Sequence, residues 1–424
     1  MKRHTISLLA LLIAAAAIGL TASSVGAQPK ASPTQVVLWH GYTGHEATAI
    51  KQEVATYNKT HPGVHVTAQF AAANDYSLQK LLTAIAGGKA PDIAYLFGSW
   101  AANIAKSPKT LNLTSLVKQP SFHYNDLWPA ARAVGKVSGR VVGVPALIDN
   151  LALVYNKKLF RQAHLAFPTA KWTWADMERA AKKLTNRSKK QFGWAYVNDG
   201  SEDTVWRFEA FLWQAGGNIL TPDGKKAAFN SPAGVKALTF LQRLAVKDKA
   251  VYLDSGNDNY ANIFNSGHIG MLYTGPWDLA GFPKVNYGVQ ILPRDRNHQT
   301  IAGPDNWILL NNSKQRSAAA WNFMKWFLST KEHMKFALAT GDLPIRTSEL
   351  KLPAYKKYVK KYKGIRTFVT NLANAKKSRP VTDKYPRISQ AIGQAVQAVL
   401  LGKAQPKAAL DQAAGQVDSI LATP

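Results

Sequence analysis

The sequence predicts an α/β fold of two lobes joined by three hinge crossings. Residues 35–96 alternate strand, helix, strand, helix, strand, which is typical of a parallel sheet covered by helices. The chain is too long for one ordinary core, since removal of residues 1–27 from the 424 leaves 397. Residues 143–157 form an apolar segment, broken by Gly143, Pro145 and a polar pair, that is suited to carry the backbone between two lobes.

Residues 1–27 have the composition of a secretory signal peptide. Lys2 and Arg3 precede an apolar run at residues 6–20, and residues 25–27 are the small residues of a cleavage site. The run is short for a membrane span, and the rest of the chain has no stretch of about 18 uninterrupted apolar residues. The chain contains no cysteine, which excludes disulfides, thiol catalysis and a lipid-bearing cysteine at the cleavage site. We therefore expect a free, exported periplasmic protein.

The first lobe is expected to begin with alternating strands and helices. Short apolar strands are predicted at residues 35–38, 64–70 and 93–96, and helical spacing predicts helices over 47–57 and 78–85. The first and third strands run into aromatic loops that contain glycine, at residues 39–44 and 97–100. Ligands bind beyond the carboxyl ends of parallel strands, so both loops are candidate parts of a binding site.

Beyond the hinge the pattern of strands and helices continues. Strands are predicted at residues 192–197, 269–273, 287–292 and 301–310, and helices at 173–184, 206–213, 235–241 and 318–327. Asp176, three residues after Thr173, predicts an approximate capping box. The chain is expected to return to the first lobe at Pro293 and to cross again at residues 341–346. The lobes are therefore predicted to comprise residues 28–147 with 294–343, and 148–293 with 344–424.

The polar pair inside the hinge segment allows two interpretations. Asp149 and Asn150 interrupt a run of branched apolar residues, and a buried strand rarely tolerates such a pair. The two residues either form a turn or point into a wet cleft between the lobes, where a polar ligand could contact them.

The charge of the chain is strongly positive. The 53 Lys and Arg against 25 Asp and Glu give +28, which becomes +26 without Lys2 and Arg3. An anionic polymer or membrane partner, an anionic small ligand, and adaptation to acid surroundings are the competing explanations. We favour the third, because a fold with few ionised carboxylates loses less stability when they protonate. Residues 351–379 hold ten basic residues and no acid, which indicates a solvated helix face or a docking surface for a membrane partner.

Sequence signatures of catalysis are missing. The chain has no GxSxG, HExxH, CxxC, GxxxxGK[ST] or GxGxxG motif, and the two pairs of nearby histidines have no evident carboxylate partner. We expect no metal, no cofactor and no enzymatic step. A glycan hydrolase is the enzymatic alternative, and its two carboxylates would have to come from Asp149, Asp278, Asp305 and Asp342 in loops. Nucleic acid is disfavoured as a partner, because the basic block lacks interleaved stacking aromatics.

Tryptophan is the residue type that points to a ligand. Five of the 12 tryptophans lie in glycine-bearing loops or at strand ends: Trp39, Trp100, Trp194, Trp277 and Trp307. An indole at such a position suits the C–H face of a sugar ring, whereas core packing is the alternative for each one. Trp321 and Trp326 belong to a helical stripe and are expected in the core. The pattern leaves Trp172, Trp174, Trp206 and Trp213 undecided.

An ordered set of segments gives the chain a family resemblance. The set comprises VVLWHGYTGHEATAIKQEVATYNKTHPGVHV, GGKAPDIAYLFGSW, GVPALIDNLALVYNKKLF, FPTAKWTWADMERAAKKLT, FNSGHIGMLYTGPWDLAGF and TGDLPIRTSEL. In this order, after a signal peptide, it resembles the extracellular solute-binding proteins of family 1, the receptors of sugar-importing ABC transporters that include maltose-binding protein. The resemblance implies a two-lobed periplasmic binding protein fold that closes on a ligand and then docks on a membrane permease.

The resemblance also implies ligand contacts. By position these are Trp39, His40, Tyr42, Asp75, Tyr76, Ser99, Trp100, Asp149, Trp277, Asp305, Trp307 and Arg346. We expect a monomeric periplasmic receptor for a carbohydrate, in which aromatic rings supply affinity and Asp149, Asp305 and Arg346 supply selectivity. The WHGYTG loop also resembles that of glycerol-3-phosphate binders, so a phosphorylated polyol bound through Arg346 and His40 is the alternative. Asp305 would repel a phosphate and suits a neutral polyol better.

Overall fold

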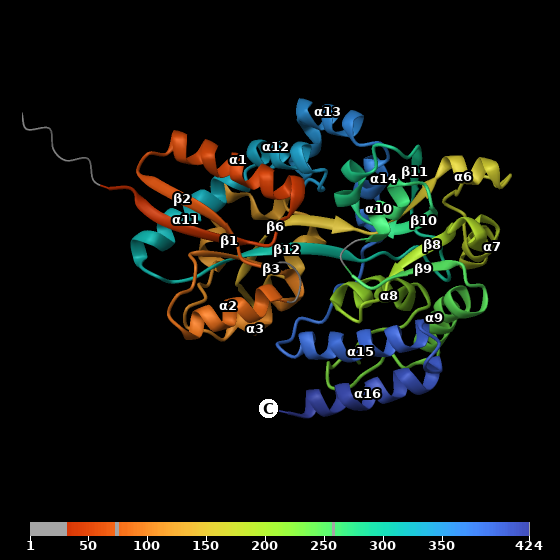
Figure 1. The fold of residues 1–424 in the computed structure, drawn as a ribbon. Coiled ribbons are helices and arrows are strands. Elements are labelled where there is room, and N and C mark those ends of the chain that lie inside the picture. The colour runs from red at the N-terminus through yellow and green to blue at the C-terminus, as the bar shows by residue number, and fades with distance from the viewer. Residues whose placement is uncertain (1–31, 73–75, 257–258, 424) are drawn as a thin grey trace, which may run out of the picture. The chain divides into compact units, whose positions relative to one another are not determined.

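The computed structural model describes residues 32–72, 76–256 and 259–423. The predicted signal peptide and the predicted ligand contact Asp75 lie outside the described residues. Within residues 33–423 two mixed sheets, each covered by helices, form the two lobes (Figure 1). The predicted α/β class with two lobes is confirmed.

The sheet of the N-terminal lobe has the strand order β2-β1-β3-β12-β6. Its strands are β1 (Thr34–His40), β2 (Val64–Phe70), β3 (Ile93–Phe97), β12 (Ala302–Leu309) and β6 (Gly143–Asn150). Strands β1, β2 and β3 are parallel, as predicted. The sheet is mixed, because β12 lies antiparallel between β3 and β6. The reason is that β12 returns from the other lobe and so enters this sheet from the opposite end.

Helices cover both faces of this sheet. The helices are α1 (Gly44–Thr60), α2 (Tyr76–Ala86), α3 (Ala101–Ala105), α4 (Thr114–Val117), α5 (Pro129–Ala133), α11 (Lys314–Phe327) and α12 (Thr330–Thr340). The main core packs α1, α11 and α12 against the sheet, and a smaller core packs α2 and α3 on the other side (Figure 1). A short hairpin, β4 (Lys136–Val137) and β5 (Arg140–Val141), precedes β6.

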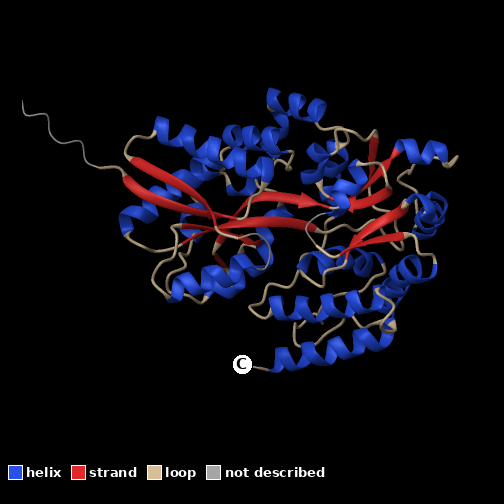
Figure 2. Ribbon diagram, viewed as in Figure 1, coloured by secondary structure: helices blue, strands red, loops and turns tan. Residues whose placement is uncertain are grey.

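The sheet of the C-terminal lobe has the strand order β11-β7-β10-β8-β9. Its strands are β7 (Ala152–Asn156), β8 (Phe192–Val197), β9 (Val251–Asp254), β10 (Ile269–Thr274) and β11 (Tyr287–Gln290). Its helices are α6 (Lys157–Gln162), α7 (Trp174–Leu184), α8 (Glu202–Gln214), α9 (Pro232–Gln242), α10 (Asn259–Asn265), α14 (Ile365–Asn371), α15 (Tyr385–Leu400) and α16 (Pro406–Ala422). Figure 2 shows helices on both sides of this second sheet. The expected capping box is present, with Thr173 and Asp176 exchanging hydrogen bonds at the start of α7.

The hinge segment passes directly from one sheet to the other. Strand β6 ends at Asn150 and β7 begins at Ala152, so a single residue, Leu151, separates them. The Asn150 side chain donates to the carbonyl of Phe368 and accepts from Asn371, both from the segment around α14. Asn150 therefore has a structural role at the crossing, whereas its neighbour Asp149 lines a cavity.

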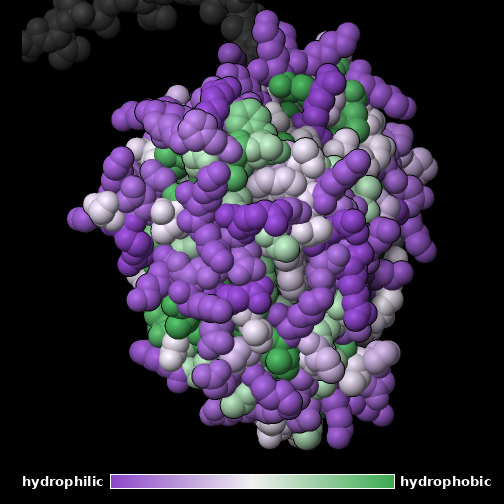
Figure 3. All heavy atoms as spheres, turned by 90° about the vertical axis from the view of Figure 1, so that its right-hand side faces the viewer, coloured by the Kyte–Doolittle hydropathy of each residue, from purple (hydrophilic) through white to green (hydrophobic). Residues whose placement is uncertain are grey.

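Basic side chains cover much of the surface. In α13 (Pro353–Lys361) the lysines at 356, 357, 360 and 361 are exposed, while Tyr358 is buried. Seen from the side of α6 and α7, the surface is largely hydrophilic, with small scattered apolar areas (Figure 3). Among the described helices, none is long and apolar enough to span a membrane.

Candidate ligand-binding site

A cavity of about 350 Å³ is lined by residues of both lobes. The N-terminal lobe contributes residues 43–46 and side chains of β3, β6 and β12. The C-terminal lobe contributes the first turns of α8, Tyr260 of α10, the 3₁₀ helix η6 (Pro276–Gly281) and Arg379. A site that draws its walls from two lobes can bind a ligand by closing around it.

The sheet edge places two acids at the cavity. On β6 and β12 the register pairs Asp149 with Gly303 and Leu147 with Asp305. Side chains two residues apart on a strand share a face, so Asp149 and Asp305 are diagonal neighbours on the adjacent strands β6 and β12. The backbones of diagonal neighbours are typically about 7–8 Å apart, with the Cβ atoms somewhat closer. Phe97 of β3 pairs with Asp305 from the other side and lines the same cavity.

Two helices begin at the cavity. Gly44, His45 and Glu46 form the first turn of α1, and Ser201 caps α8, where it accepts a hydrogen bond from the amide of Asp203. A helix N-terminus carries a partial positive charge that attracts anions. Here the first turns already carry acids, Glu46 on α1 and Glu202 with Asp203 on α8.

Two indoles of the C-terminal lobe form the aromatic wall. The ring centroids of Trp206 and Trp277 lie 5.7 Å apart, with a tilt of 43° between the planes. The Trp277 ring folds back over Gly275, where a Cβ atom would lie 1.8 Å from its ring. Across the cavity a Cβ atom at Gly303 would lie 2.9 Å from Cζ2 of Trp206, so glycine allows this approach of the two lobes. The Trp206 side chain is 7% exposed, and its Nε1 has no hydrogen-bond partner among the described residues.

The acids on the N-terminal side of the cavity raise one another's pKa. Burial raises the pKa of Asp149 well above its usual value, and the charges of Asp342, Glu46 and Asp305 raise it further. The pKa of Glu46 is raised in the same way, first by burial and then by Asp342 and Asp305. Burial raises the pKa of Asp305 to about 8, although a hydrogen bond from Tyr95 and the charge of Arg379 act against it.

The arginines of the cavity are engaged by other acids. Arg379 forms an ion pair of 2.6 Å with Glu202, and both side chains are buried. Arg207 pairs with Asp203 one helical turn away and lies over the ring of Tyr260. Asp278 accepts a hydrogen bond of 2.5 Å from the hydroxyl of Thr274. The cavity therefore combines aromatic faces with more carboxyl groups than its two arginines neutralise.

Three of the predicted contacts line this cavity: Asp149, Trp277 and Asp305. Trp307 lies instead in the core. It follows Asp305 by two residues on β12, at a position that α11 covers with Phe323 and Phe327. Its ring stacks on Phe327 at 4.6 Å, and its Nε1 donates to the hydroxyl of Tyr42. Tyr42 and His40 are also buried in this lobe and do not line the cavity. Burial lowers the pKa of His40 to about 4, and the charge of Lys51 lowers it further.

The remaining predicted contacts of the first lobe lie elsewhere. Trp39 is half-buried, and its Nε1 donates to Gln69 on β2. Tyr76 is 79% exposed at the start of α2. Ser99 is fully buried, and Trp100 lines a second cavity with residues of α15. This second cavity shares Ser201 and Glu202 with the first.

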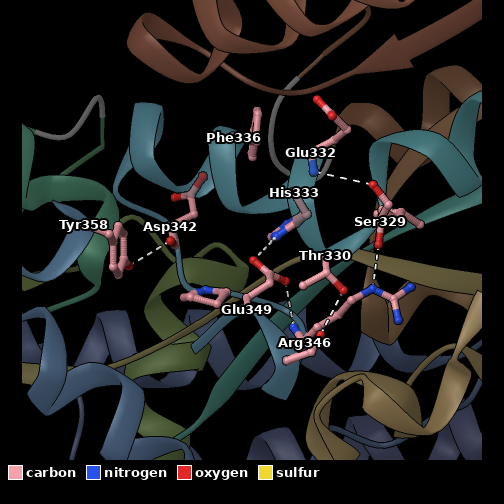
Figure 4. A network of polar contacts seen from close by, with 12 residues as sticks. Ser329, Thr330, Glu332, His333, Phe336, Asp342, Arg346, Glu349 and Tyr358 are labelled. Carbon is pink, nitrogen blue, oxygen red and sulfur yellow. Dashed lines mark hydrogen bonds and ion pairs between the residues drawn. The ribbon is translucent and has the colours of Figure 1, made fainter. Parts of the chain in front are cut away.

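Arg346 holds its own loop rather than facing the cavity. Its Nε donates to the carbonyl of Leu328 at 2.6 Å, and its Nη1 donates to that of His123 at 3.0 Å. Figure 4 shows Arg346 and His333 on either side of Glu349. These partners explain why a buried arginine near the predicted third crossing is not directed at a ligand.

Several cavity residues were not predicted from the sequence. Trp206 is one of four tryptophans for which the sequence leaves core packing and ligand contact both open, because it lies in a predicted helix rather than in a glycine-bearing loop. Arg379 falls within the basic block at residues 351–379, and Glu46 falls between the aromatic loop at 39–44 and the helix predicted over 47–57. The residues at the start of α1 could have been found, since they directly follow the aromatic loop after β1.

A family model described as bacterial extracellular solute-binding protein matches residues 43–334. The chain belongs to this family. It is a solute-binding protein of the ABC transporter type, and such proteins are non-enzymatic receptors.

Several known proteins resemble this solute-binding protein over most of their length. The sn-glycerol-3-phosphate-binding periplasmic protein of Yersinia pseudotuberculosis is 21% identical over 92% of both chains. The structure of the cyclic alpha-maltosyl-1,6-maltose binding protein from Arthrobacter globiformis is 29% identical, with a TM-score of 0.77 over 92% of this chain and 99% of that one. The tagatose-bound solute-binding protein from Thermotoga lettingae is 27% identical, with a TM-score of 0.81 over 92% and 100%.

Proposed function

We propose that this solute-binding protein captures a carbohydrate between its two lobes and delivers it to the permease of an ABC transporter. The observation that supports this most is the cavity between the lobes, whose walls combine the Trp206 and Trp277 indoles with several carboxyl groups. Indole faces suit the C–H faces of a sugar, and carboxyl oxygens accept hydrogen bonds from its hydroxyls. The sugar-binding proteins from Arthrobacter and Thermotoga support the same ligand class.

The proposed mechanism is closure about the hinge crossings. Asp149 and Asp305 belong to the N-terminal lobe, and Trp206 and Trp277 belong to the C-terminal lobe. A ligand that contacts both sets stabilises only the closed form, so its binding raises the closed population. The proposed lobes are residues 28–147 with 294–343 and 148–293 with 344–424, with the first boundary moved from residue 147 to Leu151, because β6 lies in the first sheet up to Asn150 and β7 begins at Ala152.

The proposed location is the periplasm. The composition of residues 1–27 supports export through a signal peptide, and the absence of cysteine from the chain argues against a lipid anchor on that residue. We propose that the protein acts as a monomer, because closure around one ligand uses the two lobes of a single chain. The exposed lysines of α13 provide a basic surface that a membrane partner could contact.

A phosphorylated polyol is the second candidate, which the Yersinia relative favours. The charge of the cavity opposes it. A phosphate next to Asp149, Asp305 and Glu46 would face carboxyl groups rather than free cations, because Arg207 and Arg379 already pair with acids. Arg346 is also turned toward the carbonyl groups of Leu328 and His123 and does not line the cavity.

Isothermal titration calorimetry separates the two candidates. The purified protein is titrated with monosaccharides, disaccharides, alditols and glycerol-3-phosphate, and tryptophan fluorescence follows the same additions. The proposal expects saturable binding of at least one uncharged or amino-bearing carbohydrate and a fluorescence change from Trp206 or Trp277. If glycerol-3-phosphate alone binds, and inorganic phosphate and salt weaken its binding, the ligand is a phosphorylated polyol and the carbohydrate proposal is wrong.

A further inference from the structure

The cavity is acidic although the protein is strongly basic. The chain as a whole carries +28, yet Glu46, Asp149 and Asp305 all line this one cavity. Within residues 32–72, 76–256 and 259–423, none of these three carboxyls has a lysine, arginine or histidine nitrogen within 4.0 Å. Their negative charge is therefore left for protons or for a ligand to neutralise.

Asp149 is the one of these three carboxyls that has a buried oxygen without a hydrogen-bond partner among the described residues. Its side chain is 5% exposed, it lines the cavity, and its Oδ1 accepts no hydrogen bond from any described residue. Apart from a backbone hydrogen bond from Leu343, the buried carboxyl has no compensating partner, and the neighbouring acids Asp342, Glu46 and Asp305 increase the cost of its charge. A cationic group in the cavity would supply both the missing hydrogen bond and the missing charge.

The aromatic wall suits the same kind of ligand. Trp206 and Trp277 line the cavity together with Tyr260, and the negative face of an indole attracts an ammonium group within about 6 Å of its centre. The unpartnered Nε1 of Trp206 is a donor for a ligand hydroxyl. Metal ions are a poorer fit, because no group of three or more acidic or histidine side chains in the described chain could hold one.

We infer that the ligand carries a protonated amine, held by Asp149, Asp305 and Glu46, on a sugar or polyol whose ring packs against Trp206. The inference rests on the proposed function for the carbohydrate part of the ligand and adds its charge. At α1, Glu46 in the first turn faces the partial positive charge of the helix N-terminus, and at α8 the acids Glu202 and Asp203 pair with Arg379 and Arg207.

Matched pairs of sugars test the charge directly. Glucosamine is compared with glucose and galactosamine with galactose at pH 7, and the two N-acetyl derivatives serve as uncharged controls with the same substituted carbon. We expect the amine to bind at least about tenfold more tightly than its neutral partner, and N-acetylation to remove the gain. Binding of the neutral sugars with equal or greater affinity would overturn the inference and leave the proposed function standing. Failure of every sugar to bind would overturn both.

Variants of the cavity acids test whether these carboxyls cause the preference for the amino sugar. Asp149→Asn keeps the size of the side chain and removes its ability to carry a negative charge, so the ratio of amine affinity to neutral-sugar affinity should fall below about threefold. Asp305→Asn is the second variant in case Asp149→Asn does not fold, and melting curves check both. Asp223→Asn removes an acid from a surface turn and should leave the preference unchanged. An unchanged preference in the folded cavity variants would overturn the assignment to these carboxyls.

Discussion

Gly303 and Trp206 belong to different lobes, and a Cβ atom at Gly303 would lie 2.9 Å from Cζ2 of the Trp206 ring. In protein structures a Cβ atom essentially never lies within 3.0 Å of a non-bonded heavy atom. In this structure the lobes are close enough to bring these two residues together. We therefore expect the pair to be in contact in the closed form and to separate when the lobes open.

Gly303→Ala should weaken ligand binding without unfolding the protein. The added methyl group overpacks the closed form at a cost of about 1–3 kcal/mol, which lowers affinity by roughly 5- to 150-fold. Calorimetric titration with the tightest sugar of the panel measures the loss. Gly415→Ala is the matched control, because its Cβ would meet no atom within 4 Å on exposed α16. Equal affinities for Gly303→Ala and the wild type would contradict the predicted contact.

Trp206→Ala and Trp307→Ala should fail in different ways. Trp206 lines the cavity, so its loss should lower affinity at least tenfold, by about 1.4 kcal/mol or more. Trp307 is fully buried between Phe323 and Phe327, so its loss should cost about 3–5 kcal/mol of folding stability. Urea unfolding and calorimetric titration of both variants separate the two effects. A Trp307→Ala protein of unchanged stability but lost affinity would reverse these roles.

The ligand-free protein should become less stable as pH rises from 6.5 to 8. The pKa of Asp305 is about 8 in the folded protein, against about 4 in an unfolded chain, so the folded state holds a proton that the unfolded state has lost. Burial likewise raises the pKa of Glu53 to about 7, with Glu332 adding to the shift. His40, with its pKa lowered to about 4, acts in the opposite direction only below about pH 6.5.

Melting curves between pH 6.5 and 8 measure this effect. Asp305→Asn removes one of the groups, so its melting temperature should fall less over the same range. A melting temperature that rises with pH in the wild type would contradict the predicted sign. Asp305 and Glu53 already hold their protons in the folded protein when pH falls below their raised pKa values. Their protonation therefore costs the fold no stability in acid surroundings.

His333 should be important for stability rather than for binding. Its Nδ1 lies 3.0 Å from Oε2 of Glu349 (Figure 4). Its Nε2 lies 3.1 Å from the carbonyl oxygen of Ala146, and all three residues are buried. His333→Leu would leave the Glu349 carboxylate without this partner, at a cost of about 3–5 kcal/mol in urea unfolding.

A double variant tests the origin of that cost. If it comes from the stranded carboxylate, His333→Leu with Glu349→Gln should be more stable than His333→Leu alone. Additive losses in the double variant would show that the two residues act independently. Ligand affinity should stay within about twofold in each folded variant, because neither residue lines the cavity.

The sequence was most informative about local structure. The spacing of apolar residues predicted β2, β8 and the helices α1 and α7 close to their observed bounds, because periodicity reports directly on which face is buried. Polar residues in an apolar strand also carried information, since Asp149 does line the cavity. The direction of β12 could not be predicted, because it depends on how the chain returns from the other lobe.

The tryptophans show where prediction from the sequence stops. Trp307 and Trp277 both follow a proline in a glycine-bearing segment, yet Trp307 is in the core and Trp277 lines the cavity. The difference arises because α11 covers the row of the sheet that holds Trp307, and no local pattern reports which rows a distant helix covers. Trp206 was undecided for the related reason that its helix α8 is buried nearly all round.

A crystal structure of the protein with the tightest sugar of the panel tests the central claim most directly. The account predicts the sugar between the lobes, with its ring on Trp206 or Trp277 and a polar group within hydrogen-bonding distance of Asp149. A sugar bound in the second cavity beside Trp100, or on the outer surface with this cavity empty, would contradict it.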